Sequence, residues 1–464
     1  HHADIGGSTA GSVAADSTEI YQEGVRIPPV KLFAGGEVVD DVLEMILLNV
    51  RTPDERRGDL RAQEAANETA RKRVHELVDK YGVDELDDAF GEIKDYSERR
   101  MRAELEAFPD GTYTFEDVLD DDGRGNTDLP VEVAVTVDGD NVHVDFAGTA
   151  DQTEGPINAV LAVTSSATYY AIRCVTDPDI PPNHGCYRPI EVDAPEGSIV
   201  NPDPPAAVVG GNLETSQRVT DVVLGAFGTE APERVTAAGQ GTMNNITFGG
   251  TDPRDGTPYA FYETQGGGFG GRTGRDGMDG VHVHMSNTMN TPVEVLETAY
   301  PLRVRRYEFR PDSGGAGEYR GGLGLRRDIQ VRDHTARFSL LAERHDHAPY
   351  GLAGGGPGGR GAAFLYDADE YDEAPGDSLG DGDDLASELG QRLPQKSVHD
   401  LDPGSVVSVR TPGAGGFGDP ERRDPAAVLR DLRLGKISGE YAREYHDVDL
   451  ETDHHDTPDD AESR

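Results

Sequence analysis

Glycine is the residue that most restricts what this chain can fold into. It accounts for 58 of the 464 residues, whereas globular domains usually contain about 7% glycine. From about Asn244 to Arg410 the glycines separate short apolar runs, which indicates strands joined by tight turns. Because glycine has no Cβ, it also lets two backbones approach closely. We therefore expect a β-rich, glycine-rich C-terminal half with many close backbone contacts.

The N-terminal half has a different pattern, in which two long helices follow residue 50. The first is predicted to begin at Thr52, where a threonine N-cap, a proline at the first helical position and two acids agree, and to end at Gly82. The second has apolar residues at helical spacing from Leu86 to Leu105. We expect residues 51–112 to form a helical hairpin.

The middle of the chain combines both patterns. Valines alternate with polar residues over 131–137, a turn follows at 138–141, and alternation resumes over 142–146, which predicts a β-hairpin. Helices are predicted at 157–175 and 211–228. The fold class is therefore α+β, with an α-rich N-terminal half. Its expected parts are 1–50, 51–112, an α+β region at 113–240, a β-rich region at 241–420 with an acidic insertion near 367–390, and two helices with a disordered acidic tail at 421–464.

The chain carries 43 basic and 87 acidic side chains, a formal net charge of −44. A polyanion of this size does not seek nucleic acid phosphates or anionic lipid. Only six of its basic residues are lysines, which we interpret as adaptation to a cytoplasm with molar salt, where dense carboxylates are screened and hydrated. The alternative is an ordinary acidic protein.

Membrane and secretory signals are missing from the sequence. No run of about 18 apolar residues and no signal segment is found, so we expect the chain neither to span a membrane nor to be secreted. Cys174 and Cys186 are its two cysteines, too few for a disulfide framework, and with His184 they match no common zinc spacing. These features favour the reducing cytoplasm.

Nucleotide-binding motifs are incomplete. The stretches 266–271 and 413–418 match Gly-x-Gly-x-x-Gly, but neither is followed by a helical pattern, which a dinucleotide site requires. The Gly435-Lys436 pair lacks the rest of a phosphate-binding loop. If the protein uses ATP, another polypeptide must bind it.

Histidines occur in two arrangements that could carry chemistry. His1, His2 and Asp4 form a cluster of nitrogen and oxygen ligands in a glycine-bounded loop, which suits a divalent transition ion, although adjacent histidines do not usually share one ion. His282 and His284 alternate on one face of a predicted strand, and the alternative is a solvated strand face. The chain begins without a methionine, so we expect further residues upstream.

Long motifs resemble the hydantoinase B/5-oxoprolinase family. They include His-His-Ala-Asp-Ile-Gly-Gly at 1–7 and Gly-Gly-Asn-Leu-Glu-Thr-Ser-Gln-Arg at 210–218. Further matching stretches lie at 19–31, 51–59, 177–186, 240–245, 262–264, 280–285, 310–317 and 411–416. The resemblance covers residue 1 to about residue 446.

The resemblance implies a two-component enzyme and roles for individual residues. An A-type ATPase subunit would phosphorylate the carbonyl of a small cyclic amide, and the B-type subunit, which this chain resembles, would complete the hydrolysis within a hetero-oligomer. His2 would bind manganese, zinc or iron together with upstream ligands. The implied catalytic residues are Asp4, Glu23, His282 and His284, and the implied substrate-binding residues are Asn244, Glu263, Gly267 and Gly268.

Two alternatives remain open at this point. The chain could be the alpha subunit of an ATP-dependent acetone carboxylase-like enzyme, acting on a small ketone. It could also be a non-catalytic subunit that docks and stabilises the ATPase.

The charge of −44 predicts that folding requires salt, because carboxylate repulsion is uncompensated at low ionic strength. The thermal unfolding midpoint should rise steeply between about 0.1 M and about 3 M KCl. A midpoint that stays level or falls over this range would contradict the interpretation of salt adaptation.

Overall fold

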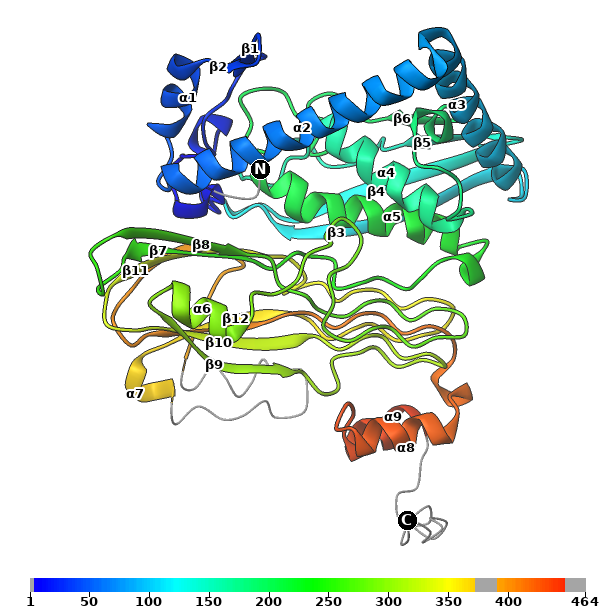
Figure 1. Cartoon of the computed structure of the whole chain (residues 1–464). Coiled ribbons are helices and arrows are strands. Elements are labelled where there is room, and N and C mark those ends of the chain that lie inside the picture. Colours follow the sequence, from blue (N-terminus) through cyan, green and yellow to red (C-terminus); the bar gives the residue numbers. More distant parts are fainter. Residues whose placement is uncertain (1–3, 372–389, 447–464) are drawn as a thin grey trace, which may run out of the picture.

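The computed structural model describes residues 4–371 and 390–446. The N-terminal half is a layer of helices on a four-stranded sheet, and the C-terminal half is a β-sandwich beneath it (Figure 1). The α+β fold with an α-rich first half and a β-rich second half is therefore confirmed. No helix within the two described ranges is both long and apolar enough to cross a bilayer.

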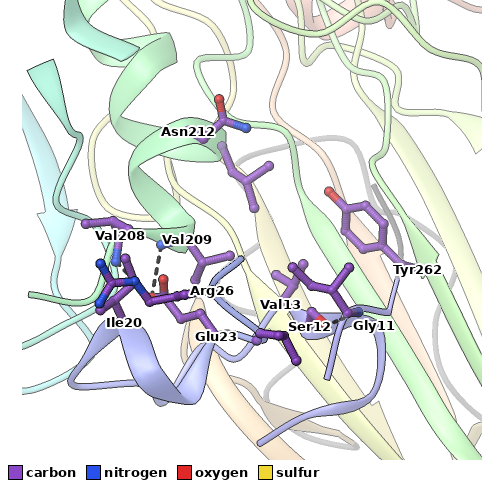
Figure 2. A pocket seen from close by; sticks show the side chains of 14 residues that line it. Gly11, Ser12, Val13, Ile20, Glu23, Arg26, Val208, Val209, Asn212 and Tyr262 are labelled. Carbon is purple, nitrogen blue, oxygen red and sulfur yellow. Dashed lines mark hydrogen bonds between the residues drawn. The ribbon is translucent and has the colours of Figure 1, made fainter. Parts of the chain in front are cut away.

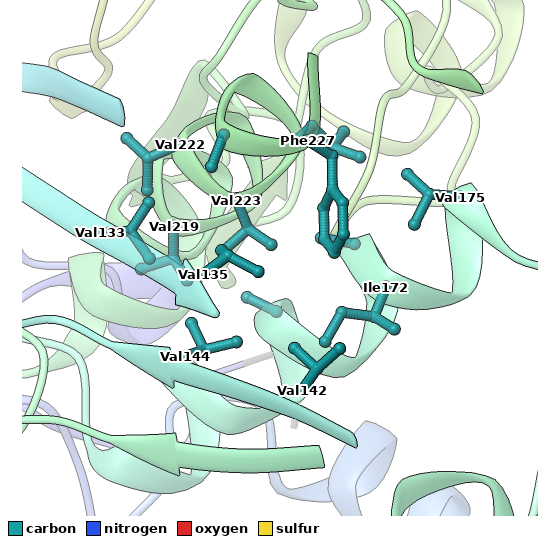
Figure 3. Packing of buried hydrophobic residues seen from close by; sticks show 14 of the residues in the cluster. Val133, Val135, Val142, Val144, Ile172, Val175, Val219, Val222, Val223 and Phe227 are labelled. Atoms are coloured by element: carbon teal, nitrogen blue, oxygen red, sulfur yellow. The ribbon is translucent and has the colours of Figure 1, made fainter. Parts of the chain in front are cut away.

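The N-terminal sheet has the order β3-β4-β5-β6, with β5 and β6 parallel and the other pairs antiparallel. The predicted hairpin is confirmed, since Asp138 pairs with Asn141 at its turn. Alternate valines of β4 and β5 point inward and pack against α4 and α5 (Figure 3). The elements are β3 (Gly111–Asp121), β4 (Thr127–Asp138), β5 (Asn141–Asp145), β6 (Ile190–Asp193), α4 (Leu161–Val175) and α5 (Ser216–Gly228).

α4 begins four residues later than the predicted start at Ile157. The reason is Asn158, whose side-chain amide donates to the carbonyl oxygens of Thr153, Gly155 and Ala207. A side chain that satisfies nearby backbone groups in this way competes with helix formation. The helix predicted at 211–228 is present, but its first turn, η4 (Gly211–Thr215), is a π-helix that continues into α5.

The long helix α2 (Pro53–Tyr81) begins and ends where predicted, although the Thr52 side chain forms no capping hydrogen bond. α3 (Val83–Leu105) begins three residues before the predicted Leu86 and ends at the predicted Leu105. Gly82 separates them with φ of 87°, a left-handed conformation that favours glycine. From Gly82 the two helices diverge, so the predicted hairpin is an open corner (Figure 1). α3 packs on the N-terminal layer through Ser97, Met101 and Leu105.

The C-terminal half consists of two antiparallel sheets of order β14-β11-β7-β8 and β13-β12-β15-β10-β9. Apolar residues from both sheets, such as Phe248, Phe338, Ile329 and Val409, form one core between them. The strands are β7 (Asn245–Thr251), β8 (Pro258–Glu263), β9 (Leu302–Phe309), β10 (Leu325–Val331), β11 (Ala336–Leu341), β12 (Ala362–Tyr366), β13 (Gln391–Arg392), β14 (Lys396–Leu401) and β15 (Val406–Arg410).

Shorter elements connect and flank these layers. They are η1 (Ala10–Ser12), η2 (Ile20–Gln22), β1 (Phe33–Ala34), β2 (Glu37–Val38), α1 (Asp40–Leu47), η3 (His184–Tyr187), η5 (Pro232–Arg234), α6 (Val293–Ala299), α7 (Ala368–Tyr371), η7 (Pro420–Arg422), α8 (Pro425–Arg433) and α9 (Gly439–His446). α8 and α9 confirm the two predicted C-terminal helices. Residues 372–389 of the predicted acidic insertion and the predicted tail at 447–464 lie outside the described residues.

Beyond the strands, glycine-rich segments run side by side and bond to one another through their backbones (Figure 1). We call the segments 265–281, 311–324, 349–361 and 411–418 the glycine bundle. Gly271 N donates to Gly415 O, and Gly415 N donates to Ala238 O, both at 2.9 Å. A Cβ on Gly413 would lie 1.7 Å from the carbonyl oxygen of Ser313. The bundle therefore fills space with backbone where other cores use side chains.

Buried charges join the two halves. Arg344, which follows β11, donates to Asp117 of β3 at 2.7 Å and to Asp221 of α5 at 2.8 Å. Glu343 also crosses between the halves, since it accepts from the backbone N–H of Asp120 in β3 at 2.8 Å. Within the C-terminal half it accepts from Lys396 of β14 at 2.5 Å, and both side chains are fully buried. Removal of one partner from a buried pair typically costs about 3–5 kcal/mol, because the other charge is left without a partner.

The glycine bundle predicts that Gly413→Ala is strongly destabilising. The new methyl group meets backbone, which has little freedom to move, so we expect a loss of about 3 kcal/mol of unfolding free energy. Gly91→Ala is the matched control, since a Cβ there meets nothing within 4 Å and alanine favours the α3 helix by about 1 kcal/mol. Denaturant unfolding in molar KCl measures both. Equal effects of the two substitutions would contradict the close packing.

Candidate functional site

The first described loop is organised by one ion pair. Asp4 is 3% exposed, and its carboxylate accepts from the backbone N–H groups of Gly6, Gly11 and Arg51 and from the Arg51 guanidinium at 2.8 Å. The same guanidinium donates to the carbonyl oxygen of Gly7. Asp4 thus holds the loop closed, and its acceptor positions are occupied by protein groups. This arrangement fits a structural role better than the implied catalytic one.

Glu23 has a different environment, although it is also buried. Its Oε1 accepts from the backbone N–H of Val208 at 2.8 Å and of Val209 at 3.0 Å, and from the hydroxyl of Ser17. Oε2 has no hydrogen-bond partner among the described residues. Burial raises the pKa of the Glu23 carboxyl above its usual value, although these three donors act in the opposite direction. One oxygen is therefore fixed and the other is available.

Glu23 lines a cavity of about 280 Å³ between the N-terminal loop and the start of the π-helical turn (Figure 2). Its walls come from segments that are far apart in the sequence. They are residues 5, 11–13, 20, 23–26, 208–209, 212–213 and 262. Arg26 also lines the cavity, and its guanidinium lies 5.4 Å from the centre of the ring of exposed Tyr21. The remaining lining is mostly apolar.

A second cavity of about 340 Å³ adjoins the first, because Asn212, Leu213 and Tyr262 line both. Glu263 lines the second cavity, where its carboxylate accepts from Arg327 at 2.5 Å and from the backbone N–H of Thr291. Together the two cavities provide space for a small molecule between an available carboxyl group and a second, paired carboxylate.

A buried chain of hydrogen bonds holds the wall shared by the two cavities. The Tyr262 hydroxyl donates to Asn245 Oδ1 at 2.9 Å, and Asn245 Nδ2 donates to Glu214 Oε1 at 2.7 Å. Glu214 belongs to the π-helical turn, and burial raises its pKa to about 8. Single π-helical turns are frequent at functional sites. Here the turn sets Asn212 and Leu213 on the cavity wall and Glu214 behind it.

The predicted strand at 281–285 is wrong, and the two histidines do not share a face. The backbone turns at His284, whose φ is 48°. His282 bonds to Ser286 and Asn290, whereas the side chain of His284 is 3% exposed and lies 3.6 Å from Asp221. Because the glycine bundle ends at this point, the chain bends instead of continuing as a strand. His284 lines a third cavity, away from Glu23.

The other residues predicted to bind substrate are placed as follows. Asn244 is fully buried and donates to Gln240 at 2.8 Å. The N–H groups of Gly267 and Gly268 donate to the carbonyl oxygens of Val281 and Pro412. These two amides therefore belong to the glycine bundle, and their N–H groups are not free to bind substrate.

The predicted metal ligand His2 and its neighbour His1 lie outside the described residues. Between residues 4 and 446, leaving out 372–389, no group of three or more histidine, cysteine, aspartate or glutamate side chains could hold a metal ion.

Sequence reasoning missed Arg26, Asn212, Glu214 and Tyr262 as parts of the site. One signal was available: Glu214, Arg218 and Asp221 follow helical spacing in a helix whose C-terminal half is apolar. Charged side chains on a buried helix face need hydrogen-bond or ion-pair partners, so this spacing indicates a buried polar network. The cavity walls gave no such signal, since they combine segments that are about 200 residues apart.

Comparison with known proteins identifies relatives along nearly the whole chain. The family model for hydantoinase B/oxoprolinase matches residues 1–420. The uncharacterized protein MJ0963 of Methanocaldococcus jannaschii is 38% identical over 94% of this chain and 72% of its own length. The putative B-type subunit of a D-/L-hydantoinase from a Pseudomonas species is 33% identical over 95% of this chain and 73% of its own length.

Solved structures agree with this assignment. The crystal structure of the ATP-dependent caprolactamase of Pseudomonas jessenii is 31% identical, with a TM-score of 0.85 over 97% of this chain and 76% of that chain. The nucleotide-free structure of acetone carboxylase also has a TM-score of 0.85, over 96% of this chain and 63% of that chain. Its sequence identity is 22%, so this comparison supports only the similarity of fold. This chain belongs to the hydantoinase B/oxoprolinase family.

Proposed function

We propose that this chain acts as a B-type subunit that opens a small cyclic amide in an ATP-dependent reaction. The observation that carries the proposal is Glu23, a buried carboxyl group with one fixed oxygen and one oxygen available at a cavity. The relatives support the reaction class, since one is named for hydantoinase and another for an ATP-dependent caprolactamase. Both hydantoins and caprolactam contain a cyclic amide.

An amide resists attack by water because its nitrogen donates electrons into the carbonyl group. Phosphorylation of the carbonyl oxygen removes this donation. We assign that step to an A-type partner in a cytoplasmic hetero-oligomer, because the chain has no phosphate-binding loop. Glu23 then accepts one proton from the attacking water as the new C–O bond forms, and it gives that proton to the ring nitrogen as the C–N bond breaks. The proton left on the new hydroxyl group passes to solvent as the carbonyl re-forms and gives an acyl phosphate. A second water hydrolyses the resulting acyl phosphate.

The two cavities suit this chemistry. The raised pKa of Glu23 brings the carboxyl closer to neutral pH, where a group that must both take and give a proton is most effective. Arg26 supplies a cation in the same cavity for phosphoryl oxygens. Tyr262 has a pKa above its usual value because of burial, so it remains a neutral phenol that packs against the substrate. No step of this scheme passes through a metal ion.

Two other functions make different predictions. The support for an acetone carboxylase-like reaction is a similar fold, since acetone carboxylase is 22% identical to this chain. A purely structural subunit would need no available carboxyl group at a cavity. Ring opening measured with hydantoins, 5-oxoproline and caprolactam, and ATP-dependent carboxylation measured with acetone, separate these functions.

The proposal predicts that Glu23→Gln separates ATP turnover from ring opening. The protein that contains this chain is combined with its A-type partner, and ADP release and amide hydrolysis are measured together. Glutamine can still accept from Val208 and Val209 but takes no proton, so ring opening should fall about 100-fold or more while the ATPase remains active. Glu37→Gln, at an exposed position of β2, should change neither rate.

Two outcomes would contradict the assignment. Full ring opening by Glu23→Gln would remove Glu23 from the mechanism. Micromolar ATP binding by this chain without the partner would contradict the division of labour between the two subunits.

The resemblance also predicts a divalent transition metal on His2, with ligands beyond those that this structure describes. His2→Ala should lower the metal content of the protein well below that of wild type. His1→Ala should have a smaller effect, because adjacent side chains point in different directions. Elemental analysis of the three purified proteins measures this, and unchanged stoichiometric metal in His2→Ala would exclude the ligand role.

A further inference from the structure

The third cavity, of about 210 Å³, lies between α4, α5 and the turn at 272–275. It is separate from the two cavities near Glu23, and no wall residue is shared with them. Its walls are Tyr170, Cys174, Leu224, Phe269, His284 and the segments 233–236 and 272–273. The mechanism above uses none of these side chains.

Several buried polar atoms at this cavity have no partner within the described residues. Neither ring nitrogen of His284 forms a hydrogen bond, although the side chain is 3% exposed, and the buried hydroxyl of Thr236 has no partner either. Behind the histidine, Asp221 Oδ1 lies 3.6 Å from His284 Nε2 and is also unbonded, while Asp221 Oδ2 accepts from Arg344. Buried polar groups in native proteins are nearly always hydrogen-bonded, so these atoms indicate a polar ligand.

The charges at the cavity indicate the sign of that ligand. Arg234 and Arg272 are exposed at its mouth, and within the described residues neither forms an ion pair. Arg234 instead lies over the ring of Phe108. One carboxylate, that of exposed Glu233, opposes the two arginines at the mouth. Acidic side chains outnumber basic ones by two to one in this protein, so two arginines without acidic partners beside unbonded donors favour an anion.

We propose that this cavity binds a small tetrahedral oxyanion of the phosphate class. Arg272 and Arg234 supply charged donors at the mouth, and the Thr236 hydroxyl and one N–H of the imidazole of His284 supply donors inside. Burial lowers the pKa of His284, so the ring is neutral and one of its nitrogens carries the proton. The strained backbone at His284, with φ of 48°, keeps the imidazole at the cavity. The proposal does not depend on the ring-opening activity.

Cys174 provides a reporter for this site. It lines the cavity and is exposed, whereas Cys186, the other cysteine, is fully buried. N-ethylmaleimide is uncharged, so its rate of reaction with Cys174 reports access to the cavity. The rate is measured in protein that contains the whole chain, with inorganic phosphate titrated at constant KCl and pH. Phosphate should slow the reaction at least about fivefold in a saturable way, and sulfate should do the same while acetate does not.

Three variants test which groups are responsible. Arg272→Gln and Thr236→Val should each abolish most of the protection, since each removes one donor and neither fills the cavity. Arg275→Gln is the matched control, because Arg275 is exposed in the same turn but does not line the cavity. Phosphate should protect this variant as it protects wild type. Unfolding midpoints show that all three variants remain folded.

The proposal is overturned if phosphate fails to protect Cys174, or if Arg272→Gln is protected as fully as wild type. Protection by acetate at equal strength would replace the phosphate class with carboxylates. Equilibrium dialysis with labelled phosphate measures binding independently of the thiol. Wild type without saturable binding in that measurement would also exclude the site.

Discussion

Direct packing of backbone against backbone is the constraint on which the rest of this structure depends. In the glycine bundle, carbonyl oxygens occupy the positions where side chains would begin, as that of Ser313 does beside Gly413. The bundle holds the segments that lead into the site. One of them continues from Gly280 through the bend at His284 to Thr291, whose backbone N–H bonds to Glu263. A side chain within the bundle would therefore displace cavity walls as well as reduce stability.

Local signals predicted much of the fold. The proline and acids after Thr52 and the stop at Gly82 mark the ends of α2, although the Thr52 hydroxyl does not cap the helix as predicted. The valine alternation with its turn marks the β4-β5 hairpin. These features depend on neighbours in the sequence. The order of strands in the sandwich depends on pairings between distant segments, such as β7 with β11, and no local pattern specifies it. The stretch 281–285 has the alternation of a strand, which explains the wrong prediction, but the bend at His284 interrupts it.

The site was less predictable than the fold. Glu23 and Glu263, implied by the family resemblance, do line adjoining cavities. Asp4 was implied to be catalytic, but its oxygens are occupied by the loop that it closes and by Arg51, which lies 47 residues further along the chain. Tyr262 is fixed at the site by its hydrogen bond to Asn245. Because it carries no charge, a search for charged residues does not find it. Geometry between remote segments decides which polar residues face a cavity and which support it.

The π-helical turn at Gly211–Thr215 changes the direction in which side chains point along this helix of the N-terminal layer. A π turn contains more residues than an α turn, so the side chains before it are rotated about the helix axis relative to those after it. Asn212 and Leu213 can thus face the cavities while Arg218 and Asp221 face the buried charges of the interior. Loss of a single residue from this turn would restore a regular α-helix and rotate one group by about 100° relative to the other. One helix can serve two differently oriented environments only while this extra residue is retained.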